Sequence, residues 1–261
     1  MSYSTLTLKT DGRGVATLTL NRPDKHNALN GEMIGELREA ADALAANASV
    51  RVVVLTGAGK SFCAGGDLDW MRTQMLASRA ERMAQARTLA SMLGALNTLP
   101  KPLIGKAQGH ALGGGIGMLC VCDVAIGVEG ARFGLTETRL GLIPATIGPY
   151  VLARMGEAMA RRVFMSARQF SADEAVALGV LARAVTAETL DAAVEAEVEP
   201  YLSTAPGAVA RAKGLARRLG PRIDDAVIEE TVIALADAWE TDEAREGIAA
   251  FFEKRKAAWV R

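Results

Sequence analysis

The stretch VVVLTGAGKSFCAGGDL, residues 52–68, joins a run of β-branched residues to a glycine-rich loop. Its Gly59-Lys60-Ser61 matches the end of a phosphate-binding P-loop, G-x-x-x-x-G-K-[ST]. That pattern needs a glycine at position 54, where the sequence has Val54, and a helix that begins at the lysine. The chain continues instead into Gly65-Gly66, which is a poor helix start. A nucleotide site is therefore not predicted here, and Ala64-Gly65-Gly66-Asp67 needs another explanation.

The overall composition limits the classes of partner. Half of the 261 residues are apolar and 23% are charged, which is enough for a sizeable core. The 30 basic and 30 acidic residues cancel, so we expect no nucleic-acid partner. Three cysteines without a C-x-x-C pair and only two histidines indicate neither a disulfide framework nor a metal site. Without a signal peptide or an apolar run of about 18 residues, the sequence predicts a cytoplasmic protein with no membrane partner.

Strand and helix patterns alternate in the first part of the chain. Strand patterns cover residues 1–9, 14–21, 51–56, 103–108 and 123–128. Asn30 is placed to cap a helix whose apolar stripe includes Met33, Ile34 and Leu37, and a second helix is expected over residues 78–99. This alternation predicts an α/β core with crossover units.

From about residue 150 the pattern becomes helical. Ser171 and Glu174 have the spacing of a capping box, and Gly179 is expected to end that helix. Further helices are expected over residues 186–199, 205–219, 223–239 and 242–259, with Pro200 as a stop or a kink. The last of these has an apolar edge that could close over the core or join subunits.

Two of the expected strands end in glycine-rich loops, Ala64-Gly65-Gly66-Asp67 and Gly113-Gly114-Gly115. Glycine lets the backbone approach a ligand, and the first N–H groups of a helix are unpaired. Two such loops side by side could present two N–H donors to one oxygen. In such an oxyanion hole each donor contributes about 3 kcal/mol to stabilising the transition state. The alternative is that the glycines only permit tight turns.

Several segments of the chain resemble those of one known family. The segments 61–68 (SFCAGGDL) and 109–115 (GHALGGG) are similar to the two signature segments of the enoyl-CoA hydratase/isomerase, or crotonase, superfamily. Further segments match the family in the order expected along the chain, at residues 20–29, 122–126, 131–134, 137–144, 246–247 and 251–255. The resemblance implies an α/β fold, a crotonase-like spiral of ββα units over residues 1–200 that carries the acyl-CoA site. It also implies a C-terminal helical oligomerisation region over residues 201–261, and homotrimers that often pair into hexamers.

The same resemblance implies the roles of particular residues. The thioester carbonyl oxygen of an acyl-CoA would accept the N–H groups of Ala64 and Gly114, which would stabilise an enolate. The CoA-binding surface would be formed by Lys25, Ala28, Ala64, Gly65, Gly66, Asp67 and Leu68. Lys254 would reach the CoA of a neighbouring subunit. No cofactor is implied beyond the coenzyme A that belongs to the substrate.

The acid/base groups depart from the family's pattern at one position. Hydratases of this family carry one glutamate two residues after the glycine triplet and another where this chain has Glu137. Here the first position is Gly117, which has no acid/base group. Glu137 is therefore predicted to be the catalytic acid/base residue. A single carboxylate can carry the proton of a Δ3-Δ2 enoyl-CoA isomerase. It can also add water if a second group positions that water, or if the same glutamate acts in both roles.

The segment IPATIGPYV, residues 143–151, bears on the acyl group. It resembles members that act as methylglutaconyl-CoA hydratases, whereas straight-chain hydratases are glycine-rich there. We therefore expect hydration of a branched or carboxylated enoyl-CoA such as 3-methylglutaconyl-CoA, with Arg139 as a candidate partner for the substrate carboxylate. A different class of function also stays open, namely a non-catalytic homologue that binds RNA or acts as a scaffold. Such a homologue would not need a carboxylate at the position of Gly117.

Three further residues near these loops could carry chemistry. For His110 we favour a hydrogen bond to the backbone over a role at the thioester. Cys63 has no histidine base in evidence, which favours packing over nucleophilic catalysis. Asp67 is expected to cap or order its loop, and it could also approach the acyl chain.

Overall fold

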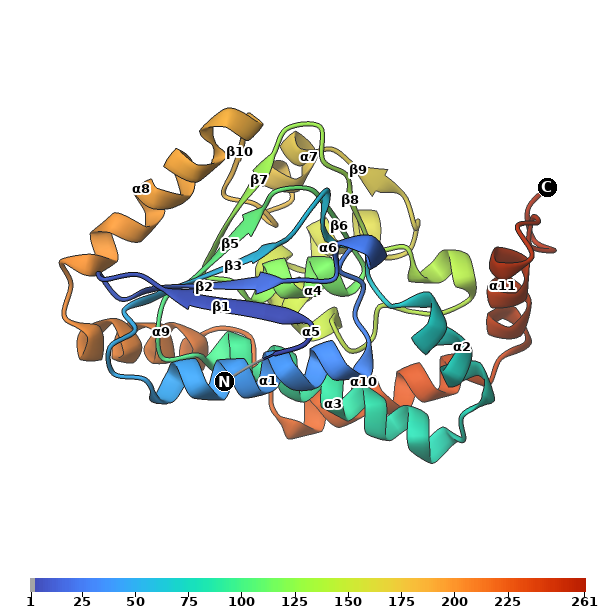
Figure 1. The fold of residues 1–261 in the computed structure, drawn as a ribbon. Helices are drawn as coiled ribbons and strands as arrows, with labels where there is room; N and C mark the ends of the chain where they lie inside the picture. Colours follow the sequence, from blue (N-terminus) through green and yellow to red (C-terminus); the bar gives the residue numbers. More distant parts are fainter. Residues whose placement is uncertain (1–2) are drawn as a thin grey trace.

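Six strands form the larger of two sheets, in the order β1-β2-β3-β5-β7-β10 (Figure 1). The computed structural model describes residues 3–261, so Met1 and Ser2 of the first predicted strand lie outside the described residues. Strands β1 and β2 are antiparallel, and every later neighbouring pair is parallel. The six strands are β1 Leu6–Thr10, β2 Val15–Leu20, β3 Val52–Gly57, β5 Leu103–Ala107, β7 Val124–Val128 and β10 Arg183–Val185. All of β3 is buried, as its β-branched run predicts for a central parallel strand.

The smaller sheet explains how the chain winds. Its strands are β4 Ser61–Cys63, β6 His110–Leu112, β8 Phe133–Gly134 and β9 Gln169–Phe170, in that order. Each successive pair, β3–β4, β5–β6 and β7–β8, gives its first strand to the larger sheet and its second to the smaller one. The chain therefore climbs as a spiral of ββα units, which confirms the predicted fold class.

Helices cover the sheets and form the C-terminal region (Figure 1). In α1 the Asn30 side chain accepts the Met33 N–H at 2.9 Å, and the predicted stripe is buried. The α-helices are α1 Gly31–Ala46, α2 Leu68–Leu76, α3 Arg79–Thr98, α4 Gly114–Val121, α5 Gly148–Met155, α6 Glu157–Phe164, α7 Ala172–Ala177, α8 Leu190–Leu202, α9 Pro206–Leu219, α10 Asp225–Trp239 and α11 Asp242–Phe252. Single 3₁₀ turns are η1 Pro23–Lys25, η2 Glu137–Leu140 and η3 Ala187–Thr189. Within residues 3–261, no helix has the length and apolarity that a bilayer crossing requires.

Three expectations about helix ends need correction. The last helix stops at Phe252 rather than Trp259, because Lys254 adopts φ +54° and the Arg255 N–H closes a Schellman motif on the Ala250 carbonyl. The Ser171 side chain caps α7, but the Glu174 carboxylate binds the guanidinium of Arg168 and does not complete the capping box. Pro200 does not stop its helix, since α8 continues to Leu202.

The last two helices pack against the segments that surround the site. Helix α10 lies along α3, and α11 lies against η2 at one end of the molecule (Figure 1). Two glycines make the second contact close: a Cβ at Gly247 would lie 2.5 Å from the carbonyl carbon of Leu140, and one at Gly141 would overlap the Glu243 backbone. A small cluster of buried apolar residues packs where α10 and α11 meet the segment after η2: Leu142, Trp239, Ala244 and Ile248. The predicted division at residue 200 and the oligomerisation role of residues 201–261 stay predictions.

Candidate active site

A cavity of about 370 Å³ lies between the two glycine-rich loops, η2 and the C-terminal helices. Most of the predicted site residues line it: Ala64, Gly65, Gly66, Leu68, Gly114, Glu137 and Arg139. Lys25, Ala28 and Asp67 do not line it. A larger groove of about 550 Å³ between α1, α3 and α10 contains none of the predicted site residues.

The first loop is fixed by backbone bonds to Leu29. The Leu29 N–H donates to the Gly65 carbonyl at 2.7 Å, and the Asp67 N–H donates to the Leu29 carbonyl at 2.9 Å. Because Leu29 engages the residues on either side of Gly66, the Gly66 N–H points away from it and makes no hydrogen bond with residues 3–261. The Ala64 N–H, by contrast, donates to the His26 carbonyl at 3.0 Å. The N–H group that the sequence analysis assigned to the oxyanion already has a partner.

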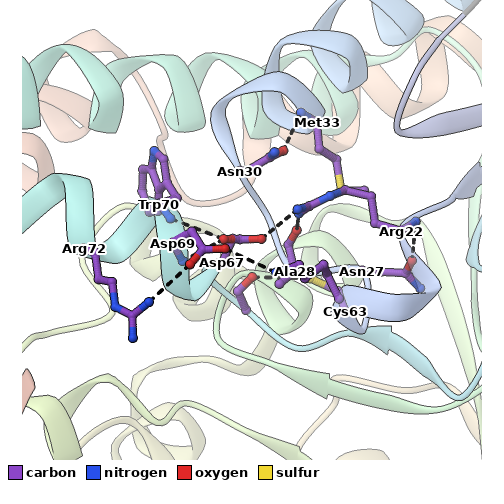
Figure 2. Close-up of polar contacts among 12 residues, drawn as sticks. Arg22, Asn27, Ala28, Asn30, Met33, Cys63, Asp67, Asp69, Trp70 and Arg72 are labelled. Atoms are coloured by element: carbon purple, nitrogen blue, oxygen red, sulfur yellow. Dashed lines mark hydrogen bonds and ion pairs between the residues drawn. The ribbon is translucent and has the colours of Figure 1, made fainter. Parts of the chain in front are cut away.

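Asp67 holds the first loop through polar contacts with its neighbours (Figure 2), and it does not line the cavity. Its Oδ1 accepts the N–H groups of Asp69 and Trp70 and so caps α2, while its Oδ2 binds Arg22 at 2.8 Å. Burial opposes ionisation, but the Arg22 guanidinium and the two N–H groups hold the pKa of Asp67 below its usual value. Arg22 also donates to the Ala28 carbonyl at 2.6 Å. The expectation that Asp67 orders its loop is confirmed.

The second loop meets the first at the start of α4. The Gly113 N–H donates to the Gly134 carbonyl at 2.9 Å, and its φ of +49° turns the chain into the helix. A Cβ at Gly113 would lie 3.6 Å from the Gly65 Cα, so the two loops touch. Gly114 is the first residue of α4, and its N–H has no partner among the described residues. The loops therefore bring two unpaired N–H groups, from Gly66 and Gly114, to the wall of one cavity.

Glu137 supplies the carboxylate of the cavity. It begins η2, and its Oε1 would lie 3.0 Å from a Cβ placed on Gly113. The residue as a whole is partly exposed, but its Oε2 is buried and has no hydrogen-bond partner among residues 3–261. Burial away from a compensating cation raises the pKa of Glu137 from the usual 4.5 to about 7. Such a carboxyl group can both accept and return a proton near neutral pH.

This arrangement has the parts of a thioester enzyme, and comparison with known proteins decides the family. The family model described as enoyl-CoA hydratase/isomerase matches residues 10–261. The chain belongs to the enoyl-CoA hydratase/isomerase family. The resemblance of the two glycine-rich segments is thereby confirmed.

Relatives of the enoyl-CoA hydratase/isomerase family match over almost the whole chain. A crotonyl-CoA hydratase of Syntrophomonas wolfei is 33% identical, covering 100% of this chain and 99% of its own. A short-chain-enoyl-CoA hydratase of Clostridium acetobutylicum is 32% identical over 98% of this chain and 97% of its own. The crystal structure of an enoyl-CoA hydratase from Shewanella pealeana is 37% identical with a TM-score of 0.81, covering 99% of this chain and 97% of that one.

Within this hydratase/isomerase fold, the space beside Gly117 is filled. Gly117 lies inside α4, and a Cβ there would lie 2.6 Å from Cγ2 and 3.0 Å from Cβ of Ile147. Ile147 is buried and lines the cavity. An apolar side chain therefore occupies the place where a second glutamate would project.

The contact between Gly117 and Ile147 can be measured by a double-mutant cycle. Gly117→Ala is expected to lower the free energy of unfolding by about 1–3 kcal/mol through overpacking, and Ile147→Ala by about 2–4 kcal/mol through a cavity. Because each substitution relieves the other, we expect the double variant to be more stable than the sum of the single changes by about 1 kcal/mol or more, in urea unfolding. Strict additivity would show that the two side chains do not compete for one space.

The other candidate side chains near this site have structural roles. His110 accepts the Arg132 N–H at 2.9 Å, as favoured from the sequence. Cys63 is fully buried, and burial raises the pKa of its thiol to about 12, so it packs and is no nucleophile. After Gly57 the chain makes a turn and then strand β4, not a helix, which agrees with the rejection of a P-loop.

Several residues of the cavity wall could not be predicted from the sequence. Thr146 and Ile147 come from the flagged segment 143–151, and no local pattern shows which of its side chains point inward. Leu235, Trp239 and Phe251 reach the wall from α10 and α11, far away in sequence. The apolar edge predicted for the last helix was the one feature of the sequence that indicated that C-terminal helices contribute to the wall.

Proposed function

We propose that this protein adds water to an enoyl-CoA thioester, with Glu137 as its acid/base group. The observation that carries the proposal is one cavity holding a buried carboxyl group of pKa about 7 and the unpaired N–H groups of Gly66 and Gly114. Addition of water at C3 moves electrons onto the thioester oxygen, and the two donors are placed to stabilise that charge. The relatives named as crotonyl-CoA and short-chain-enoyl-CoA hydratases support the same reaction.

For the oxyanion donors we assign Gly66 and Gly114 in place of the predicted pair Ala64 and Gly114. An N–H group that already donates within the fold would have to break that bond to serve a substrate, and the Ala64 N–H is bound to His26. Among the residues that the structure describes, the Gly66 N–H has no such bond to break. Each donor is worth about 3 kcal/mol in the transition state, provided that it is free and preorganised.

The coenzyme A portion is proposed to lie outside the cavity, along the loops that flank its mouth. Lys25 is exposed and its ammonium group binds Asp69 at 3.2 Å, which leaves it free to exchange that partner for a phosphate. Ala64, Gly65 and Leu68 line the cavity itself, and Ala28 accepts a bond from Arg22 through its carbonyl. The CoA roles of Lys25 and Ala28 are thus proposals for the outer part of the site, and Lys254 stays a proposal for a neighbouring subunit.

For the acyl group we propose a branched or carboxylated enoyl chain such as 3-methylglutaconyl. Arg139 lines the cavity and its guanidinium makes one long bond, 3.4 Å, to the Ala167 carbonyl. Its remaining donors are free to pair with a carboxylate at the far end of a substrate. The rest of the wall is mainly apolar and suits a methyl branch.

A second candidate function is movement of the double bond from C3–C4 to C2–C3, without addition of water. Filling of the Gly117 space by Ile147 favours this isomerase, because it leaves one glutamate that can carry a proton between the α- and γ-carbons. Hydration stays our first proposal, since a single carboxyl group near its pKa can serve both proton transfers of water addition.

One assay distinguishes these candidates. Purified protein is incubated with 3-methylglutaconyl-CoA, crotonyl-CoA or a 3-enoyl-CoA, and products are resolved by mass. Hydration predicts a product heavier by one water, with kcat/KM for the carboxylated substrate reduced about 10-fold or more in Arg139→Met while crotonyl-CoA is unaffected. Unchanged mass with a shifted double bond would identify an isomerase, and no turnover of any substrate would favour a non-catalytic role.

Assembly and location are further parts of the proposal. Phe251, Trp259 and Val260 are each more than 40% exposed near the C-terminus, and we propose that they pack between subunits of a trimer or a hexamer. A cytoplasmic location is proposed with it.

A further inference from the structure

Thr146 holds a hydroxyl group that the fold leaves unused. Its side chain is 3% exposed, and its Oγ1 is buried with no hydrogen-bond partner among the described residues. Buried polar groups are nearly always paired, so an unpaired one needs an explanation such as a bound water or a catalytic role. Three buried side-chain atoms lack a partner in residues 3–261, and two of them, Thr146 Oγ1 and Glu137 Oε2, belong to residues that line the active-site cavity.

The neighbouring residue explains why a hydroxyl would be needed there. Ile147 fills the space beside Gly117, so this cavity holds one glutamate and has no room for a second at that position. A water molecule held by one carboxylate alone remains free to rotate about that bond. A second hydrogen-bonding partner fixes the direction of the oxygen lone pair toward the carbon to be attacked.

We propose that Thr146 positions the attacking water and so replaces the second carboxylate that Gly117 does not provide. The inference rests on the proposed hydration. One hydrogen of the water bonds to Thr146 Oγ1 and the other to the Glu137 carboxylate. The water oxygen forms its bond to C3 and the water proton passes to Glu137. The π electrons of the C2=C3 bond form the C1=C2 bond of an enolate, and the carbonyl π electrons move onto the thioester oxygen at Gly66 and Gly114. Glu137 then returns the proton to C2, so one water is added and Thr146 keeps its proton.

A matched pair of variants tests this role. Thr146→Val keeps the shape and removes the hydroxyl, whereas Thr146→Ser keeps the hydroxyl and removes a methyl group. We expect Thr146→Val to lower kcat for hydration about 10- to 100-fold with little change in KM, and Thr146→Ser to stay within about threefold of wild type. The thermal midpoint of Thr146→Val should be equal or higher, because an unpaired buried hydroxyl is removed.

A second readout separates water positioning from general damage to the site. Exchange of the α-protons of butyryl-CoA in D₂O needs Glu137 and the oxyanion donors but no attacking water. We expect this exchange to be unchanged in Thr146→Val. Hydration at the wild-type rate in Thr146→Val, or equal loss of hydration and exchange, would overturn the role of Thr146. A wild type that exchanges protons but adds no water would overturn the proposed hydration itself, together with this role.

Discussion

Glu137→Gln is expected to lower kcat for hydration by about 10³-fold or more while leaving acyl-CoA binding nearly unchanged. The amide has almost the same size as the carboxyl group but cannot take the proton from water. Because Glu137 serves both proton transfers in the proposed reaction, no other group compensates for its loss. The measurement is the initial rate of water addition to crotonyl-CoA, with the dissociation constant of a saturated acyl-CoA determined in parallel.

The same variant has a second signature in its stability. The pKa of Glu137 is raised in the folded protein, so the fold favours the neutral acid and loses stability as the pH rises from 4.5 through about 7. The rise corresponds to about 3 kcal/mol. We expect Glu137→Gln to match wild type near pH 4.5 and to be more stable at pH 8 by up to that amount. Retained activity would remove Glu137 from the mechanism, and equal stability at pH 8 would contradict the burial of its carboxylate.

Gly247→Ala is expected to lower kcat about 100-fold, although Gly247 does not line the cavity. Its added Cβ would lie 2.5 Å from the carbonyl carbon of Leu140, the last residue of η2, and neither backbone can yield easily. The turn that carries Glu137 must shift, and a displacement of about 1 Å in a reacting group is enough for such a loss. Steady-state kinetics with crotonyl-CoA measure the loss of kcat, and urea unfolding measures the accompanying change in the free energy of unfolding.

Gly35→Ala provides the matched control for this substitution. Gly35 also lies inside a helix, α1, but a Cβ there would meet nothing within 4 Å. The control should gain about 1 kcal/mol of stability from better helix propensity and keep its kcat. If Gly247→Ala behaved like Gly35→Ala, α11 would not constrain the position of Glu137.

Much of the spiral could be predicted because its central strands and helices have strong local patterns. The buried run of β3 and the Asn30 cap of α1 are two examples. The strands of the smaller sheet have only two or three residues, so they are defined by their neighbours and leave no periodicity to detect. Helix α2 was missed because it is mostly exposed and lacks an apolar stripe.

The site could be predicted only as far as residue types carry the chemistry. Glu137 and the glycine-rich loops stand out as such residues. Which N–H group of the first loop is free depends on two distant partners, the His26 carbonyl and the backbone of Leu29, and neither partner can be identified from the local sequence. The occupation of the Gly117 space by Ile147 is equally a matter of packing in three dimensions.

The close contact between α11 and η2 has a consequence for the order of synthesis. Glu137 leaves the ribosome long before Gly247, yet the backbone of Gly247 is what its turn rests against. In a nascent or proteolysed chain that ends before Asp242, η2 would lack the backbone against which it packs. The position of Glu137 therefore depends on a helix that is synthesised after both glycine-rich loops.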